Sequence, residues 1–432
     1  MVPLSTSELT KLSRTLARAI AIDEVNQLGR DTGQAMRLRT VTPHRLFLAV
    51  VSALGSGRVE TLADLLRAFN HQHGVTVAYK AFYNRLARVG FARFMQQMLI
   101  RLMTQLRLET LTLDGERAIA RFTDIVIQDG TSFAVKPALA ATFPGRFTTI
   151  EPAAVEVHAT YSGLADDVTH VAIAPDAHAE RPFLPAPALL QGRLLLADRG
   201  YPDVQYFAAV TAAGGAFIVR LTRSYDPEVR AAWVDGRPLQ VAPGWRLAWV
   251  LARHAGHVVD ADVDFHRGRQ RVGVRVVALP SRDRWMTRLC TNLPRTPFTT
   301  GLIARLYRFR WQIELYFKEW KSYANLHQFD TANPHIAAGL IAASLCAAVL
   351  KRFLAHAAQR IGHGTAMSTR RVAMCAHHVL DDLVQALRTG VGLRPALRRC
   401  VAYLLANARR AHPDRDIRTG RLRAGLLLRA VA

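Results

Sequence analysis

Short apolar runs that do not alternate with polar residues constrain the fold of this chain most strongly. Ile125–Ile127 and Leu194–Leu196 are two such runs, and Ala216–Leu221 is a third in which Arg220 is the one charged residue. Strands of this kind are typically covered on both faces of a sheet, whereas half-exposed strands alternate apolar and polar residues. Two further stretches with strand character, Ala153–Tyr161 and Val168–Ile173, lie between the first run and the second. A meander of three strands followed by strand, helix and strand predicts an α/β protein built on a mixed sheet.

The stretch from 224 to 297 has a different pattern and predicts a β-rich insertion into that core. Its expected strands are separated by Gly, Asp, Arg and Pro and cover Arg246–Ala252, Val258–Phe265, Arg271–Leu279 and Trp285–Thr291. Long periodic segments on either side predict helical terminal regions. The expected division is a helical N-terminal DNA-binding region at 1–115, the sheet core at 116–223 and 298–335, the insertion at 224–297, and a helical, basic C-terminal region at 336–432.

The chain is strongly basic, and this charge limits its partners. It carries 57 Lys and Arg against 33 Asp and Glu, a formal net charge of +24 and a pI of about 11.0. Such an excess indicates binding to a phosphate polymer or to an anionic membrane surface. The membrane is the weaker alternative, because the apolar run Ile336–Leu350 is too short to span a bilayer. The 4 cysteines form no CxxC pair and the N-terminus lacks a signal-peptide pattern, so we expect a reducing cytoplasm.

One stretch, Tyr307–Lys321, combines charged groups with an apolar face. It contains neither Pro nor Gly and predicts one continuous helix. On a helix turning 100° per residue, five polar side chains fall within a stripe about 80° wide. They are Tyr307, Arg310, Glu314, Lys318 and Lys321. A solvated charged face with i,i+4 ion pairs is the commoner explanation for a single helix of this kind. The alternative is a carboxylate framed by groups that bind the phosphates of a polyanion.

Two short helical stretches near the N-terminus suit a helix-turn-helix. Thr61 opens a helix through Phe69, Gly74 provides the turn, and a second helix runs over Thr76–Val89. In this interpretation the second helix faces the DNA groove with Tyr79, Lys80, Tyr83, Asn84, Arg85 and Arg88. Any helical hairpin would show the same pattern, so DNA reading and a purely structural role are equal alternatives here.

Two aspartates at the ends of apolar strands and one helical glutamate form the candidate catalytic set. Asp129 and Asp198 come after the first two apolar runs, and Glu314 comes from the charged helix. A side chain at a strand end is held rigidly beside a loop that opens toward a cleft. Three carboxylates can converge only if protons or cations offset their repulsion. Hard oxygen ligands favour Mg²⁺ or Mn²⁺, and two such ions would support an in-line displacement at phosphorus. For either Asp alone, turn chemistry is the simpler explanation.

At these residues the sequence resembles a known family. Four residues have the spacing of the YREK signature found in bacterial insertion-sequence transposases of the family-four type, which are DDE recombinases: Tyr307, Arg310, Glu314 and Lys321. Asp129 in Gln-Asp-Gly-Thr-Ser is similar to the first metal-binding aspartate of that family, and Asp198 in Ala-Asp-Arg-Gly-Tyr is similar to the second. A β-strand insertion between the second Asp and the Glu is also a family feature. The resemblance extends over about Thr123–Lys321.

The resemblance implies a ribonuclease-H-like core and cut-and-paste transposition. In that scheme a metal-activated water cleaves the end of the element, and the freed 3′-hydroxyl attacks target DNA. The implied partners are double-stranded DNA, as terminal inverted repeats and target, and a second copy of the chain in a homodimer on the DNA. The implied location is the bacterial cytoplasm, in association with the nucleoid.

The resemblance also implies DNA contacts. Cationic and phenolic groups would hold backbone phosphates, and one tryptophan would stack on a flipped base. The implied residues are Tyr307, Arg310, Lys318, Lys321 and Arg199 for phosphates and Trp285 for the base. Trp245 and Trp249 are alternatives for the stacking role.

Two other functions are alternatives to transposition. A catalytically silent regulator that binds DNA ends would have no use for three mutually repelling carboxylates. A ribonuclease-H-like nuclease without strand transfer would instead degrade DNA that lacks terminal repeats.

Overall fold

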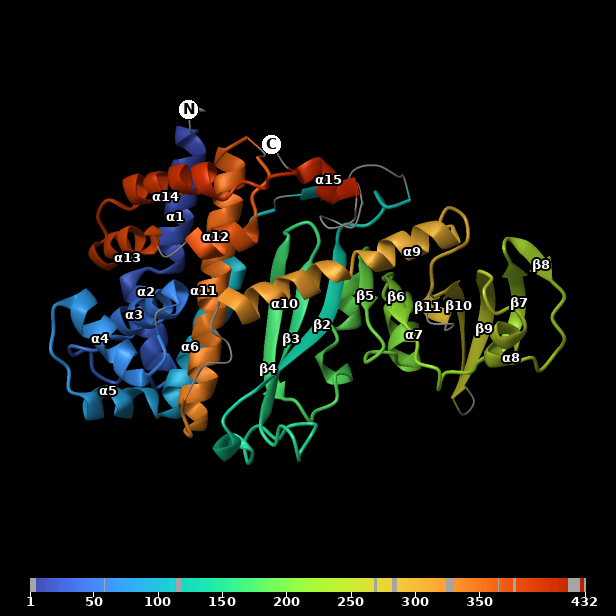
Figure 1. The fold of residues 1–432 in the computed structure, drawn as a ribbon, viewed down its shortest axis with the longest axis horizontal. Helices are drawn as coiled ribbons and strands as arrows, with labels where there is room; N and C mark the ends of the chain where they lie inside the picture. Colours follow the sequence, from blue (N-terminus) through green and yellow to red (C-terminus); the bar gives the residue numbers. More distant parts are fainter. Residues whose placement is uncertain are drawn as a thin grey trace.

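The computed structural model describes residues 5–57, 59–109, 111–113, 118–267, 270–281, 286–323, 330–363, 365–375, 378–418 and 428–430. Helices from both ends of the sequence gather on one side of a long sheet, and the strands after β6 lie at its far end (Figure 1). The mixed α/β architecture predicted from the apolar runs is confirmed.

Among the described residues, a ten-stranded sheet organises the fold, in the order β4-β3-β2-β5-β6-β11-β10-β9-β7-β8. The β2–β5 and β5–β6 pairs are parallel, and the other neighbours are antiparallel. Its strands are β2 (Ile125–Ala134), β3 (Ala154–Ser162), β4 (Asp167–Pro175), β5 (Leu194–Ala197), β6 (Ala216–Arg220), β7 (Glu228–Val234), β8 (Arg237–Leu239), β9 (Val259–Arg267), β10 (Gln270–Pro280) and β11 (Met286–Thr291). A separate pair joins β1 (Leu111–Leu113) to β12 (Leu428–Ala430). Strands expected as an insertion therefore continue the core sheet beyond β6.

The central parallel strands are buried on both faces, as their lack of alternation predicts. Ile127 pairs in register with Leu196, and Leu196 pairs with Ile218. These three side chains belong to the larger hydrophobic core, which the terminal helices share. The intervening side chains, such as Val126 and Leu195, belong to a second core on the opposite face. Residues two apart along β2 or β5 therefore have their side chains on the same face of the sheet.

Helices pack on both faces of the sheet. The N-terminal helices are α1 (Thr6–Ala19), α2 (Ile22–Asp31), α3 (Pro43–Ser56), α4 (Leu62–His73), α5 (Tyr79–Leu86) and α6 (Val89–Gln105). The helices after the sheet are α9 (Thr300–Arg308), α10 (Trp311–Tyr323), α11 (Pro334–Ile361), α12 (Thr369–Cys375), α13 (Leu380–Thr389), α14 (Leu393–Asn407) and α15 (Pro413–Arg418). On the opposite face lie α7 (Val204–Ala212) and α8 (Leu247–Arg253). The short 3₁₀ helices are η1 (Pro137–Leu139), η2 (Arg181–Phe183) and η3 (Pro187–Leu190). Helices α9 and α10 cross in front of the strands that carry the candidate aspartates (Figure 1).

The N-terminal helical hairpin exists as α4 and α5. Thr61 and Asp64 form a reciprocal capping box at the start of α4, and Gly74 ends the helix in the left-handed region with φ 60°. Lys80 and Asn84 are exposed on α5, whereas Arg85 is half-buried and donates to the Gln34 carbonyl. An exposed polar face is thus present, and DNA reading by this face stays a prediction.

The single continuous helix expected over Tyr307–Lys321 is wrong, because the chain turns between α9 and α10. The amides of Phe309 and Arg310 donate to carbonyls three residues back, so the helix tightens and breaks at this point. No Pro or Gly marks the break. Phe309 is 1% exposed and its ring lies against Gly163, where a Cβ would be only 2.9 Å from the ring. Tertiary packing of this ring therefore overrides the local helix propensity.

The strand expected at Arg246–Ala252 is also wrong. Leu247–Arg253 forms helix α8, and Asp226 accepts a 2.6 Å hydrogen bond from the Ala248 amide in its first turn. Leu247, Val250 and Leu251 are buried, a spacing of three and four that matches a helix and not a strand. The short length of the run hid this periodicity.

Helix α11 is the central helix of the α-helical body. Within the described residues it is long and apolar enough to cross a membrane by length and composition, and 83% of its most apolar window is buried inside the protein. It packs against α3, α6, α12 and α14. This burial is typical of the core helix of a globular protein.

Candidate active site

The two candidate aspartates lie side by side at adjacent parallel strands. Asp198 directly follows β5, as expected, whereas the strand end expected at Asp129 is wrong, because β2 continues to Ala134 through its pairing with β3. The last register pair between β2 and β5 joins Gln128 to Ala197, so Asp129 and Asp198 occupy the next position along each strand. Neighbouring strands are about 4.8 Å apart. Asp129 lies two residues after Ile127, and Asp198 lies two residues after Leu196. Both carboxylates therefore point to the face of the sheet that α9 and α10 cover.

Glu314 reaches this pair from the first turn of α10, and Arg310 lies between the acids. The Arg310 guanidinium donates to Oδ2 of Asp129 and, over 2.6 Å, to Oε1 of Glu314. The Arg310 side chain is only 11% exposed. One buried cation thus joins a carboxylate of the sheet to a carboxylate of the covering helix.

Asp198 has partners of its own. The Tyr307 hydroxyl donates to Asp198 Oδ1 over 2.9 Å, and Arg220 Nη1 lies 3.8 Å from the same oxygen. Arg220 was not predicted as a site residue. Its position follows from the register of Ala197 with Val219, since Arg220 is one residue further along β6. Aligning the ends of the two apolar strands β5 and β6 would have found it in the sequence.

The electrostatics of the site follow from this crowding. Burial raises the pKa of Asp129 to about 7, against the opposing effect of the Arg310 cation, and the charges of Asp198 and Glu314 add to the rise. Burial, followed by the Asp198 charge, raises the pKa of the Tyr307 phenol. Tyr307 therefore stays protonated at neutral pH and acts as a hydrogen-bond donor to Asp198.

The three carboxylates suit a divalent ion in their chemistry, although their present arrangement does not surround one. Over the described part of the chain, no group of three or more His, Cys, Asp or Glu side chains is placed to hold a metal ion. The Arg310 guanidinium lies between two of the acids and neutralises them. Oxygen ligands of this kind fit Mg²⁺ or Mn²⁺. In this arrangement the Arg310 guanidinium engages the carboxylate oxygens of Asp129 and Glu314 that a metal ion would use as ligands.

The other residues predicted to contact DNA differ in how close they lie to the three carboxylates. Lys321 Nζ donates over 2.8 Å to the Ser132 carbonyl of β2, so its charge lies along the strand of Asp129. Lys318 is exposed, with Nζ 5.3 Å from the centroid of the Trp311 ring. Arg199 is exposed beside Asp198. Trp285 lies outside the described residues.

A polar cluster that was not predicted from the sequence lies behind the two aspartates. On β3, Glu156 and His158 face Gly130 across the sheet, and the Glu156 carboxylate fills the space that a Cβ on Gly130 would need. Glu180 occupies the corresponding space beside Gly200. Each aspartate motif therefore contains a glycine that makes room for a carboxylate. Gly130 and Gly200 were the sequence features that could have indicated this cluster.

Arg146 holds this cluster together. One of its guanidinium nitrogens lies 3.2 Å from Glu156 Oε2 and 3.7 Å from Glu180 Oε1. Burial, followed by repulsion from Glu180, raises the pKa of Glu156 to about 7. The cluster thus carries more acidic than basic groups directly beneath the candidate site.

Comparison with known proteins identifies the class. A family model described as Transposase DDE domain matches residues 120–350, more than half of the chain, and this stretch contains Asp129, Asp198 and Glu314. The chain belongs to this family of transposases. Transposase DDE domains act in phosphoryl transfer on nucleic acids and generally use divalent metal ions.

Individual relatives are insertion-sequence transposases. The chain is 21% identical over 366 residues to the transposase for insertion sequence element IS1151 of Clostridium perfringens, a match that covers 74% of this chain and 75% of that protein. It is 42% identical over 62 residues to the transposase for insertion sequence element IS421 of Escherichia coli, which covers 14% of this chain and 17% of the relative. Among solved structures, a piggyBac transposase synaptic complex with hairpin DNA aligns with 95% of this chain and 91% of that chain at 9% identity and a TM-score of 0.48.

Proposed function

We propose that this chain is a cut-and-paste DNA transposase of the family-four insertion-sequence type with a ribonuclease-H-like core. The observation that carries the proposal is the convergence of the signature residues on the two aspartates. Tyr307 contacts Asp198, while Arg310 contacts both Asp129 and Glu314. The spacing of the YREK signature and the match to the DDE family support the same conclusion.

Asp129, Asp198 and Glu314 are the proposed metal ligands, for Mg²⁺ or Mn²⁺ and for two ions. Bound there, the ions would activate the attacking water or 3′-hydroxyl and offset charge on the leaving oxygen. The protein residues orient these groups. Tyr307 holds Asp198 by its hydroxyl, and Arg310 provides a cation that exchanges its carboxylate partners for a DNA phosphate.

The proposed DNA contacts use the cations around the acids. Lys318, Lys321 and Arg199 would bind backbone phosphates, which positions the duplex without reading its sequence. Trp285 is kept as the candidate for base stacking. The proposed substrates are the terminal inverted repeats and a target duplex, with two copies of the chain on paired ends in the bacterial cytoplasm. Residues 1–115 would bind DNA, 116–223 and 298–335 would form the catalytic core, and 336–432 would add a basic helical surface.

The test is metal-dependent nicking of labelled DNA that carries the inverted repeats flanking the coding region. We expect nicking at the repeat end, followed by strand transfer, only with Mg²⁺ or Mn²⁺. Glu314→Gln should lower nicking at least about a hundredfold while DNA-end binding is retained. Asp381→Asn, an exposed acid on α13, is the matched control and should nick normally.

Two results would contradict the proposal. Equal degradation of DNA without repeats, with no strand transfer, would indicate a nuclease. End binding with no nicking under any divalent metal would indicate a silent regulator.

A further inference from the structure

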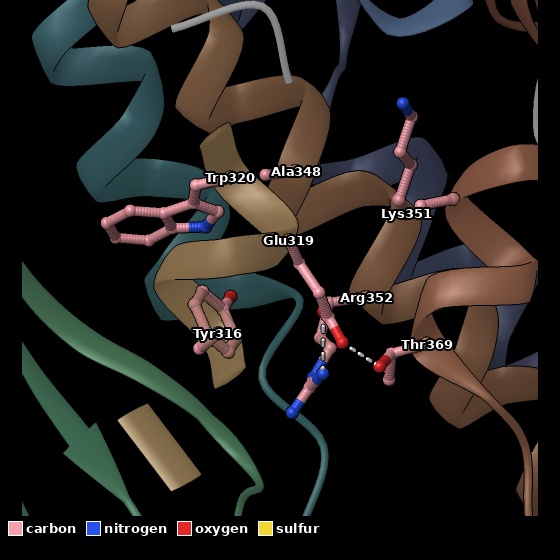
Figure 2. A pocket seen from close by; sticks show the side chains of 8 residues that line it. Tyr316, Glu319, Trp320, Ala348, Lys351, Arg352 and Thr369 are labelled. Atoms are coloured by element: carbon pink, nitrogen blue, oxygen red, sulfur yellow. Dashed lines mark hydrogen bonds and ion pairs between the residues drawn. The ribbon is translucent and has the colours of Figure 1, made fainter. Parts of the chain in front are cut away.

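Helix α10 is held by a buried polar network on the side opposite Glu314. Tyr316 and Glu319 are two and five residues after Glu314, so they lie about 200° and 140° around the helix from it. Figure 2 shows Glu319 between Arg352 of α11 and Thr369 at the start of α12. Arg352 Nη1 donates to Glu319 Oε2 over 3.1 Å, and the Thr369 hydroxyl donates to Oε1. Both carboxylate oxygens are thus engaged by neighbouring helices.

Arg352 also ties the network to the sheet. Its Nε donates over 2.8 Å to the Asp166 carbonyl, and its Nη2 donates over 2.8 Å to Asp166 Oδ1. Asp166 lies in the turn between β3 and β4, with a positive φ of 51°. One guanidinium therefore joins α11, α10 and the turn that follows β3. Arg352 is only 8% exposed, so these hydrogen bonds are shielded from water.

Tyr316 provides a second attachment of α10, to the first residue of β4 directly after this turn. Its hydroxyl donates over 2.5 Å to Asp167 Oδ1, and its ring lies 4.8 Å from Arg352 Cζ. The edge of the Tyr161 ring packs against it at a centroid distance of 6.0 Å. Tyr316, Tyr161 and Asp167 are each less than 5% exposed. Two residues of one helical face are therefore bonded to groups outside the helix.

We propose that Arg352 is a positioning residue for Glu314. Arg352 acts through Glu319 and Tyr316, and these contacts set the rotation of α10 about its axis. This inference rests on the proposed role of Glu314 as a metal ligand. Apolar packing of α10 is non-directional, whereas hydrogen bonds have preferred angles. A rotation of about 20° would move a group 5–6 Å from the helix axis by ~2 Å. A misplacement of about 1 Å can cost on the order of a hundredfold in rate.

The experiment uses two shape-conserving variants, Tyr316→Phe and Glu319→Gln, because Arg352→Met leaves two carboxylates uncompensated and is prone to misfold. Arg352→Lys is added because it keeps the charge but not the forked geometry. The control is Arg101→Met, since Arg101 also makes three hydrogen bonds to other elements but lies on α6, away from α10. Circular dichroism confirms folding. The readouts are Mn²⁺ affinity by calorimetry, hydrogen exchange of α10 amides, and nicking rates over a range of DNA concentrations.

We expect Tyr316→Phe, Glu319→Gln and Arg352→Lys to weaken Mn²⁺ binding at least about fivefold and to lower kcat at least about tenfold. KM for DNA should stay within about twofold, and α10 amides should exchange faster. The positioning role is wrong if Mn²⁺ affinity and kcat stay within about twofold of the unchanged protein, or if Arg101→Met loses as much. If the unchanged protein neither binds Mn²⁺ nor nicks DNA, the proposed function fails and the positioning role fails with it. Normal Mn²⁺ binding by Glu314→Gln would also contradict the proposed role of Glu314 as a metal ligand, and the positioning role would fail with it.

Discussion

The Tyr307 hydroxyl donates a 2.9 Å hydrogen bond to Oδ1 of Asp198, which joins the end of α9 to the end of β5. Three residues later, within the turn between α9 and α10, Arg310 contacts Asp129 on β2 and Glu314 on α10. The turn therefore directs these two side chains of the signature to two neighbouring strands. A straight helix would have kept them in one row.

The Tyr307 hydroxyl is expected to orient Asp198 and to add little else. Tyr307→Phe keeps the ring and removes one hydrogen bond, so the free energy of unfolding should fall by about 1 kcal/mol. Nicking should slow several-fold, because Asp198 is no longer held in one rotamer. Urea denaturation and single-turnover nicking measure the two effects. A rate equal to that of the unchanged protein would show that the bond has no part in the reaction.

Arg310 is expected to compete with metal ions for the carboxylates in the DNA-free protein. Arg310→Gln removes a cation bound to Asp129 and Glu314, so Mn²⁺ should bind at least about threefold more tightly without DNA. Nicking should nevertheless fall, because a phosphate contact is lost. Calorimetry with Mn²⁺ gives the affinity, and Arg308→Gln, on an exposed position of α9, is the control. Unchanged or weaker Mn²⁺ binding would contradict the competition.

Glu156 is expected to make the protein less stable as the pH rises. Its pKa is raised to about 7 in the folded protein by burial and by Glu180, from an ordinary value of 4.5. The folded state therefore holds a proton that the unfolded state releases, and this contribution to stability is full below about pH 4.5 and is lost as the pH rises through about 7. Glu156→Gln should raise the free energy of unfolding at pH 8 by roughly 1 to 3 kcal/mol and leave it nearly unchanged at pH 4.5.

The measurement is urea denaturation across this pH range. Glu151→Gln, an exposed acid nearby, should reproduce the pH dependence of the unchanged protein. A pH dependence that Glu156→Gln does not flatten would assign the effect to another group.

DNA affinity is expected to fall steeply with salt. With a net charge of +24, many phosphate contacts release many counterions. With about six or more contacts, affinity should fall on the order of a thousandfold between 50 and 200 mM salt. Fluorescence anisotropy with a labelled duplex at several KCl concentrations gives the slope. A slope that indicates only one or two contacts would contradict an extended basic surface.

Much of the sheet and the candidate acids could be predicted from short stretches. Ile125–Ile127 and Leu194–Leu196 were identified as strands because a buried parallel strand leaves a contiguous apolar run. Asp129 and Asp198 are recognisable because each follows an apolar run, and Glu314 because cations and a phenol surround it on one helical stripe. The helix α8 was misassigned because a run of seven residues shows too few turns to separate the two periodicities.

The sequence by itself determined which short apolar runs form strands, which acids follow those runs, and how strongly basic the chain is. These properties depend on neighbouring residues and on composition. Only the tertiary structure decided that Arg220 aligns with Asp198, that the signature helix turns at Phe309, and that Arg352 bonds α10 to the β3–β4 turn. Each of these depends on strand register or on packing between distant segments, and local propensity carries no information about such contacts.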